Sequence, residues 1–397
     1  MIDTETQPVC ISGVATVMPF SSDWAEVYQA AARGEVAFEP WEDKLEPPHA
    51  GARLGLVRQY PKDRYFNERQ LRLMDRAMAI AATATGLALE DAGLVDRAGS
   101  HPDDFATLFA SMRGEIPSLY KFGTPLFEGR GSFNPALFPM IARNISCGQA
   151  ALRFGLRGWS SMLSCGEVSG MHAVSRGLEL VRSGRSPYAV VCAYEVLSKL
   201  SLHQTQRRWS KLGLEPGAAR GHSAVPVEGA CVLLLEPLAS VRARGGRAYA
   251  TLQDVDHGFL RGEPGEGAHA VVRRWVERSG LLIGERIDLV GQGCGVGAVS
   301  AGVLEQALYD AMAEVRTLGG SLDSRQQLGD AGSVSALLQL ACLARTLGDA
   351  GPAPGLQARP ADDARPAASP PRSALAIQAT DRHAYSLALL GHAGAAP

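Results

Sequence analysis

The sequence predicts an α/β protein made of two halves that repeat one pattern of strands and helices. Residues 160–164 have the composition of a strand, and they precede a turn at Gly166, a helix over 169–183 and an apolar strand over 187–193. A strand, a helix and a strand in this order indicate a parallel sheet covered on both faces. A similar succession returns after residue 248, and a chain of 397 residues that is 46% hydrophobic can build a core in each half.

The other elements of the first half are predicted from the spacing of apolar residues and from the Pro and Gly residues that end each element. The β-rich run from Val9 to Val17 is the first predicted strand, and Pro19 ends it. Residues 71–91 carry apolar side chains at helical spacing up to Gly93, which predicts one long helix. The remaining predictions are strands over 104–111 and 230–236, an irregular surface segment over 35–65 and a long loop rich in Phe and Pro over 113–140.

The second half is predicted from the same signals. Its elements are strands over 248–255, 287–290 and 374–378 and helices over 267–279, 301–316 and 333–347. Residues 349–373 are rich in Pro, Ala, Asp and Arg, and we expect a flexible excursion there because such a segment buries little apolar surface. We therefore divide the chain into an N-terminal half over 1–245 and a C-terminal half over 246–397.

Composition and charge exclude several classes of protein. The 39 basic residues are scattered among 41 acidic ones, so a nucleic-acid partner is not expected. No stretch of about 18 apolar residues is free of charge, and the N-terminus lacks the pattern of a signal peptide. The 7 Cys are widely spaced without a CxxC pair, so we expect a cytoplasmic protein without a bound metal or a disulfide framework.

Four segments, in this order, resemble the beta-ketoacyl synthase family. The segments are the opening strand with its Gly at 9–14, the helix from Met74-Asp-Arg-Ala to Leu89-Glu-Asp-Ala-Gly-Leu94, the strand and turn at 158–170, and Val227-Glu-Gly-Ala with the strand that follows to Glu236. The resemblance implies the thiolase fold, in which two pseudo-repeated halves form an α/β/α/β/α layered body, and it usually implies a dimer.

The resemblance also implies a chemistry. In the family, a Cys in a strand-to-helix turn accepts an acyl chain from a carrier protein, because the helix N-terminus lowers the pKa of its thiol. Two His residues assist decarboxylation of the malonyl carrier protein and stabilise the developing oxyanion. The substrates are acyl groups on the phosphopantetheine arm of the carrier protein, and no cofactor is expected.

This sequence departs from the family at each catalytic position. The nucleophile position falls on Glu167, and Cys165 stands two residues early, at the end of the strand. The first His position falls on Gly293 when it is counted from the preceding motif residue and on Cys294 when it is counted back from the following one. In the segment similar to the second His motif, Arg325 takes the place of the Lys and Asp330 the place of the His. The C-terminal Gly-Phe-Gly-Gly loop is also missing, with Ala379-Thr-Asp-Arg in its place.

Two functions remain open. The chain resembles the chain-length factors of type II polyketide systems, which pair with a catalytic ketosynthase and shape the acyl channel. The Phe-rich segment 122–138 is then a candidate for the interface or channel, or else a loop packed on its own body. Alternatively, Glu167 is a general base for hydrolysis, acyl transfer or decarboxylation of a carrier-protein thioester, favoured by the helix dipole. The simpler role for Glu167 is helix capping.

The remaining His, Cys and Gly residues are weaker candidates for a functional role. We expect His172 to be a packed or half-buried helix residue, and we place His222, His257 and His383 in loops. We expect Cys165 to be a small apolar filler. The glycines over 291–297 match a phosphate-binding loop only loosely, because the early-chain context and the acidic ribose partner are missing. The resemblance to the family implies a partner subunit, which is a catalytic ketosynthase or a second copy of this chain.

Overall fold

A computed structural model describes most of the chain. The described residues are 7–34, 36, 38–41, 52–101, 104–129, 134–211, 225–279, 286–292, 299–315, 317–348, 371–380 and 384–394. The predicted excursion over 349–373 lies outside them except for residues 371–373.

Ten strands of the described chain form one sheet. In the first half they are β1 (Val9–Val17), β4 (Phe105–Ala110), β5 (Ser160–Leu163), β6 (Tyr188–Glu195) and β7 (Gly229–Pro237). In the second half they are β8 (Ala250–Phe259), β9 (Arg286–Gln292), β10 (Thr317–Leu322), β11 (Ser373–Ala379) and β12 (Ala384–Gly391). Their order across the sheet is β10-β9-β11-β12-β8-β1-β7-β6-β4-β5.

The two sets of strands repeat one topology. From the outer edge inward, the strands of the first half are β5, β4, β6, β7 and β1, and those of the second half are β10, β9, β11, β12 and β8. When the strands of each half are numbered in chain order, both series read third, second, fourth, fifth and first. The sets meet where Val9–Ile11 of β1 pairs antiparallel with 250–252 of β8. The predicted repetition of two α/β halves is thereby confirmed.

The sheet is mixed, and the parallel pairing that the order strand, helix, strand predicts is confirmed for the outer strands. Strand β4 is parallel to β5 and β6, and β9 is parallel to β10 and β11. The inner strands are antiparallel to their neighbours on both sides. The reason lies in the connections: Glu195, where β6 ends, is opposite Gly229, where β7 begins, so the chain returns along the sheet without a crossover.

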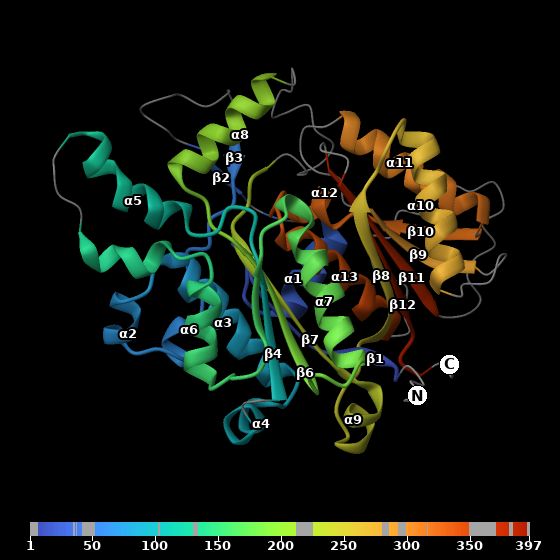
Figure 1. The fold of residues 1–397 in the computed structure, drawn as a ribbon, viewed down its shortest axis with the longest axis horizontal. Coiled ribbons are helices and arrows are strands. Elements are labelled where there is room, and N and C mark those ends of the chain that lie inside the picture. Colours follow the sequence, from blue (N-terminus) through green and yellow to red (C-terminus); the bar gives the residue numbers. More distant parts are fainter. Residues whose placement is uncertain are drawn as a thin grey trace.

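Helices form three layers around the strands (Figure 1). The middle layer contains α7 (Ser169–Arg182), α13 (Val334–Gly348) and α1 (Trp24–Arg33), which share one core with both sets of strands. On the outer face of the first set lie α3 (Arg76–Asp91) and α6 (Ile145–Phe154). On the outer face of the second set lie α10 (Pro264–Ser279) and α11 (Val299–Val315). This is the α/β/α/β/α arrangement that the sequence predicted.

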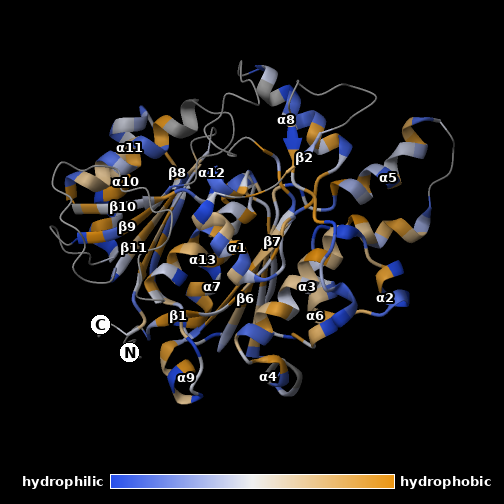
Figure 2. Cartoon of the chain, turned by 180° about the vertical axis from the view of Figure 1, so that it is seen from behind, coloured by the Kyte–Doolittle hydropathy of each residue, from blue (hydrophilic) through white to orange (hydrophobic). Residues whose placement is uncertain are grey.

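Burial explains the composition of the middle layer. Helix α13 is apolar around its circumference, as its largely orange ribbon shows (Figure 2), because it is packed between the two sets of strands. Strand β6 alternates in the usual way: Val191 faces the middle layer, whereas Val190 and Cys192 face the outer helices. Both faces of the strand are buried, and its sequence is therefore apolar throughout.

Two predictions about the first half were wrong. The helix expected over 71–91 is interrupted, because the Asp75 carboxylate accepts a hydrogen bond from the Met78 amide at 2.9 Å and caps α3. The short α2 (Glu68–Arg72) precedes it. The loop expected over 113–140 contains α5 (Ile116–Phe127) and the 3-10 helix η3 (Pro135–Ile141). Pro117 lies in the first turn of α5, where a proline costs no helical hydrogen bond.

The segment over 35–65 has short regular elements and a buried side. It contains β2 (Glu39–Pro40), β3 (Arg53–Leu54) and the 3-10 helix η1 (Lys62–Arg64). Trp41 and Leu54 pack with Leu202 of α8 (Lys199–Lys211) in a small core of their own. The remaining helices are α4 (Val95–Ser100), α9 (Leu238–Ala243) and α12 (Ser324–Leu328).

Candidate active site

A tight turn between β5 and α7 carries Glu167. Gly166 adopts a φ of 74°, which favours glycine, and opens the 3-10 turn η4 (Gly166–Val168) that leads into α7. The Ser169 hydroxyl braces the turn, because it accepts from the Cys165 amide at 2.7 Å and donates to the Gly166 carbonyl at 2.5 Å. Glu167 is buried, with 5% of its surface exposed.

The second half of the molecule supports this turn. Gln378 at the end of β11 donates through Nε2 to the Glu167 carbonyl at 3.3 Å. The Ser386 hydroxyl on β12 in turn donates to Gln378 Oε1 at 3.3 Å. The turn of the first half is therefore fixed by side chains of the second, and the site lies between the two halves.

Helix α7 also makes a close approach to the segment before α13. A Cβ atom at Gly170 would lie 2.4 Å from the Ser333 carbonyl oxygen and 2.7 Å from Leu337 Cδ1. Only glycine allows this spacing without a shift of the backbone. The structure therefore brings the segment that contains Asp330 against the beginning of the helix that follows Glu167.

Asp330 and Arg325 form a buried ion pair. Arg325 Nη2 lies 2.6 Å from Asp330 Oδ1, and the same oxygen accepts from the Gly332 amide at 3.0 Å. The two residues are 2% and 6% exposed. Gly329, with a φ of 84°, turns the chain back after α12 and makes this contact possible across five residues.

Sequence reasoning missed a buried carboxylate next to this segment. Glu195, the last residue of β6, accepts from the Met112 and Arg113 amides at 2.5 and 3.2 Å and from the Ser333 hydroxyl at 2.6 Å. Arg113 Nη1 lies 3.7 Å from Glu195 Oε2, which also accepts from the Arg113 amide. Burial raises the pKa of Glu195, and Arg113 opposes that shift. A charged residue that ends an apolar strand was the available signal, because functional groups gather at the carboxyl ends of parallel strands.

A second buried carboxylate was also missed. Glu115 accepts from the Tyr194 hydroxyl at 2.6 Å and from the Ser146 hydroxyl at 2.9 Å. Burial raises the pKa of Glu115, whereas these two hydrogen bonds lower it. Tyr194 and Glu195 are neighbours on β6, so both carboxylates are held from the end of the same strand.

The remaining predicted groups are placed as follows. Cys165 is exposed rather than a buried filler, because β5 ends at Leu163 and the thiol precedes the turn. His172 is half-buried on α7, as expected, and its ring centroid lies 3.9 Å from that of His257. His257 was expected in a loop but lies on β8. Four predicted residues lie outside the described part of the chain: Gly293, Cys294, His222 and His383.

The two imidazoles favour the neutral state. Burial, and then the neighbouring His257, lowers the pKa of His172 to about 4. Burial likewise lowers the pKa of His257, although Asp256 opposes the shift. Both rings therefore behave as packed side chains at neutral pH.

Comparison with known proteins decides the family. The family model for the beta-ketoacyl synthase N-terminal domain matches residues 6–240, which is more than half of the chain. The chain belongs to the beta-ketoacyl synthase family. It is 25% identical over 359 residues to 3-oxoacyl-[acyl-carrier-protein] synthase 2 of Rhizobium meliloti, covering 83% of this chain and 84% of that protein. It is 25% identical over 249 residues to the tetracenomycin polyketide synthase ketoacyl synthase alpha subunit of Streptomyces glaucescens, covering 58% and 52%.

Solved structures show the thiolase fold of this family over nearly the whole chain. The ishigamide ketosynthase/chain length factor superposes with a TM-score of 0.78 at 17% identity, covering 97% of this chain and 99% of that one. A beta-ketoacyl synthase from Burkholderia phymatum superposes with a TM-score of 0.77 at 18% identity, with the same coverage. Within the described residues of this family member, no helix has the length and apolarity to cross a membrane.

The chemistry open to this beta-ketoacyl synthase family member follows from its turn. A carboxylate is a poor acyl acceptor, because the anhydride it would form hydrolyses readily. A buried carboxylate can, however, accept a proton. Within the described residues, no group of three or more His, Cys, Asp and Glu side chains is arranged to hold a metal ion.

Proposed function

We propose that this chain is a chain-length-factor-type subunit that pairs with a catalytic ketosynthase in type II polyketide or fatty-acid-like biosynthesis and shapes the acyl channel. The observation that carries the proposal is the burial of Glu167, which the resemblance assigns to the nucleophile position, in the turn before α7. The thiol nearest to Glu167 in the sequence, that of Cys165, precedes the turn and is exposed. In this proposal the partner supplies the reactive thiol.

The Asp330 segment supports the same proposal. At the position proposed for the second His, the carboxylate is engaged by Arg325 and by the Gly332 amide. Such a group stabilises the loop and offers no imidazole N–H to a developing enolate. Loss of one oxyanion donor costs roughly 2.7–4 kcal/mol of transition-state stabilisation in comparable sites. Gly293 or Cys294 at the first His position stays a proposal from the sequence.

An exposed sheet edge supports a partner subunit. Within the described chain, β5 pairs with β4 alone and ends the sheet. Beside it, Trp159 is 53% exposed and Leu152 of α6 is 79% exposed. An edge strand flanked by exposed apolar side chains is a surface that pairs with another chain.

Helix α5 and η3 extend this apolar surface. They project from the body of the molecule next to α6 (Figure 1), and Phe127 is 93% exposed. The rings of Phe122 and Phe138 pack at 6.1 Å between centroids, so part of the segment is packed on itself. Phe133 lies outside the described residues. We infer that β5, α5 and η3 form the face for a catalytic ketosynthase or a second copy of this chain.

The similar proteins support the proposed partners. One structural neighbour is a type II polyketide synthase acyl-carrier protein in complex with its ketosynthase, with a TM-score of 0.71 at 16% identity over 98% of this chain and 99% of that one. Another is a ketosynthase/chain length factor. For this chain, an acyl carrier protein that presents phosphopantetheine-linked acyl groups is the proposed substrate carrier.

Reconstitution of the pair tests the proposal. The chain is co-expressed with a ketosynthase that retains its Cys and both His residues, and carbon–carbon bond formation is measured with malonyl carrier protein. Glu167→Ala is expected to leave turnover within a few fold, because the residue does no chemistry in this role. A loss of 100-fold or more with the complex intact contradicts the proposal, since removal of a catalytic acid or base costs about 10²–10⁴-fold.

The burial of Glu167 favours one alternative function. A buried carboxylate before a helix N-terminus is placed as a general base for hydrolysis or decarboxylation of a carrier-protein thioester. The purified chain alone would then consume acyl or malonyl carrier protein, and Glu167→Gln would abolish that turnover. We expect no turnover without the ketosynthase.

A further inference from the structure

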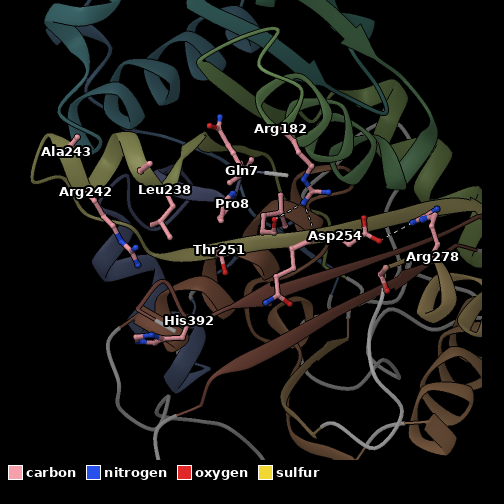
Figure 3. A pocket seen from close by; sticks show the side chains of 15 residues that line it. Gln7, Pro8, Arg182, Leu238, Arg242, Ala243, Thr251, Asp254, Arg278 and His392 are labelled. Atoms are coloured by element: carbon pink, nitrogen blue, oxygen red, sulfur yellow. Dashed lines mark hydrogen bonds and ion pairs between the residues drawn. The ribbon is translucent and has the colours of Figure 1, made fainter. Parts of the chain in front are cut away.

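A cleft of about 1280 Å³ lies at Arg182, where α7 ends (Figure 3), whereas Glu167 precedes the start of that helix. It is walled by the last turn of α7, by α9, and by the first residues of β1 and β8. Helix α7 has 14 residues, so the cleft is about 20 Å along the helix from the turn before α7. The cleft is therefore a feature separate from the candidate active site.

Two arginines in this cleft lack a carboxylate partner. Arg182 donates through Nη2 to the Gln253 carbonyl at 2.6 Å and to the Leu252 carbonyl at 3.4 Å. Arg242 donates through Nη2 to the Ala393 carbonyl at 3.0 Å. Neither forms an ion pair with any residue that the structure describes. Each guanidinium is thus oriented by a carbonyl and keeps further N–H groups for an acceptor.

The third arginine of the cleft is neutralised. Arg278 lies 3.1 Å from Asp254 and 2.7 Å from Asp256. Asp254, the acidic residue in the lining, is therefore already engaged, and it also accepts from Trp275 Nε1 at 2.6 Å. The lining retains two guanidinium groups, those of Arg182 and Arg242, that form no ion pair with a described residue. Burial lowers the pKa of Arg182, and the charge of Asp254 opposes that shift.

The surface between the two cations is mixed but largely apolar. Figure 3 shows Arg182 and Arg242 apart, with Pro8, Leu238 and Thr251 between them. Leu238 is a buried apolar residue of the lining. The Thr251 hydroxyl is engaged with the Gly391 carbonyl at 3.0 Å. A complementary ligand has an acidic group at each end and an apolar body between them.

We propose that this cleft binds a small organic dianion, with one acidic group on Arg182, the other on Arg242 and an apolar body against Leu238 and Pro8. Guanidinium groups bind carboxylate and phosphate oxygens through paired N–H donors, so either acid type meets the requirement. The cleft exceeds the usual size of a small-molecule site, so it has room for such a ligand.

Calorimetric titration of the full chain with α,ω-dicarboxylates tests the proposal. The series runs from hexanedioate to dodecanedioate, because its members share both acidic groups and differ in the apolar spacer. We expect saturable binding with an optimum chain length, and at least tenfold weaker binding of the monocarboxylate of the same length. Arg182→Gln and Arg242→Gln each lower affinity to the monocarboxylate value, whereas Arg273→Gln, an exposed arginine outside the cleft, leaves it unchanged.

Three results overturn the proposal. They are the absence of saturable binding at millimolar ligand, equal affinity for the dicarboxylate and the monocarboxylate, and full retention of binding in Arg182→Gln. Thermal unfolding of each variant shows that the fold is intact, and Arg182→Lys provides a second variant that keeps the charge and removes the paired donors. The readout is independent of carrier-protein turnover, so it is unaffected by the outcome for the proposed function.

Discussion

Arg325 and Asp330 form an ion pair at 2.6 Å inside the molecule, across the turn at Gly329. The Asp330 main chain is fixed as well, because its amide donates to the Val225 carbonyl at 2.7 Å and its carbonyl accepts from the Val227 amide at 2.9 Å. A segment that we propose to replace a catalytic His motif therefore has a structural use in this chain. Its main chain joins the two halves, and its side chains stabilise the turn at Gly329.

Removal of one partner of this pair is expected to be costly. Arg325→Met or Asp330→Leu leaves an uncompensated buried charge, which costs about 3–5 kcal/mol of the free energy of unfolding. The double variant Arg325→Met/Asp330→Leu is expected to recover a large part of that loss. Urea unfolding of the four chains gives the coupling energy. Single variants within 1 kcal/mol of wild type would show that the pair does not stabilise the fold.

Replacement of Glu167 by cysteine separates acyl transfer from condensation. In Glu167→Cys, the thiol stands before α7, whose N-terminus favours the thiolate. With Cys165→Ala in the background, we expect the variant to accept an acyl group from acyl carrier protein. We expect no condensation with malonyl carrier protein, because Asp330 does not replace an imidazole. Product formation by the variant alone, followed by chromatography, would show that the histidine positions are not needed.

One substitution that introduces a charge tests the proposed interface. Phe127→Asp places a carboxylate on the exposed apolar surface of α5, and we expect co-purification with a ketosynthase to fall at least tenfold. Val303→Asp on α11 is the matched control, since Val303 is 49% exposed and lies on the far side of the molecule (Figure 1). Sedimentation of each mixture measures the complex. If both variants lose the complex equally, or if neither loses it, the interface lies elsewhere.

The neighbouring imidazoles of His172 and His257 predict a pH dependence of stability. Folding lowers the pKa of His172 from 6.5 to about 4, so the folded state favours the neutral ring. This contribution is complete above pH 6.5 and is lost as the pH falls towards 4. In His172→Gln, the free energy of unfolding should fall less steeply over this interval than in wild type. Parallel slopes in urea unfolding at pH 7, 6, 5 and 4 would mean that protonation of His172 is not coupled to folding.

Most strands of the central sheet were predictable, except β10 and β12, and the directions of the strands were not. Val9–Val17 and the apolar core of β6 are runs whose burial demands apolar side chains on both faces. Periodicity gives no strand direction, however, so the antiparallel pairing of β6 with β7 was missed. Strand β12 (Ala384–Gly391) was missed, because local sequence does not show that this apolar run pairs with the run that ends at Ala379.

The assignment of Glu167 and Asp330 to the site stays a prediction that rests on the resemblance to the family motifs. The structure brings the segments that contain them together at α7. The carboxylates of Glu115 and Glu195 were missed because their partners, Ser146 and Ser333, are distant in sequence. Burial and hydrogen bonds between distant residues arise from the fold, and no local pattern records them.

Intact-protein mass spectrometry of the reconstituted complex tests the central claim most directly. The complex of this chain with a catalytic ketosynthase is incubated with an acyl carrier protein thioester, and both subunits are weighed before malonyl carrier protein is added. The account predicts an acyl adduct on the ketosynthase and an unchanged mass for this chain. An acyl adduct on this chain, at Cys165 or at any other residue, would contradict it.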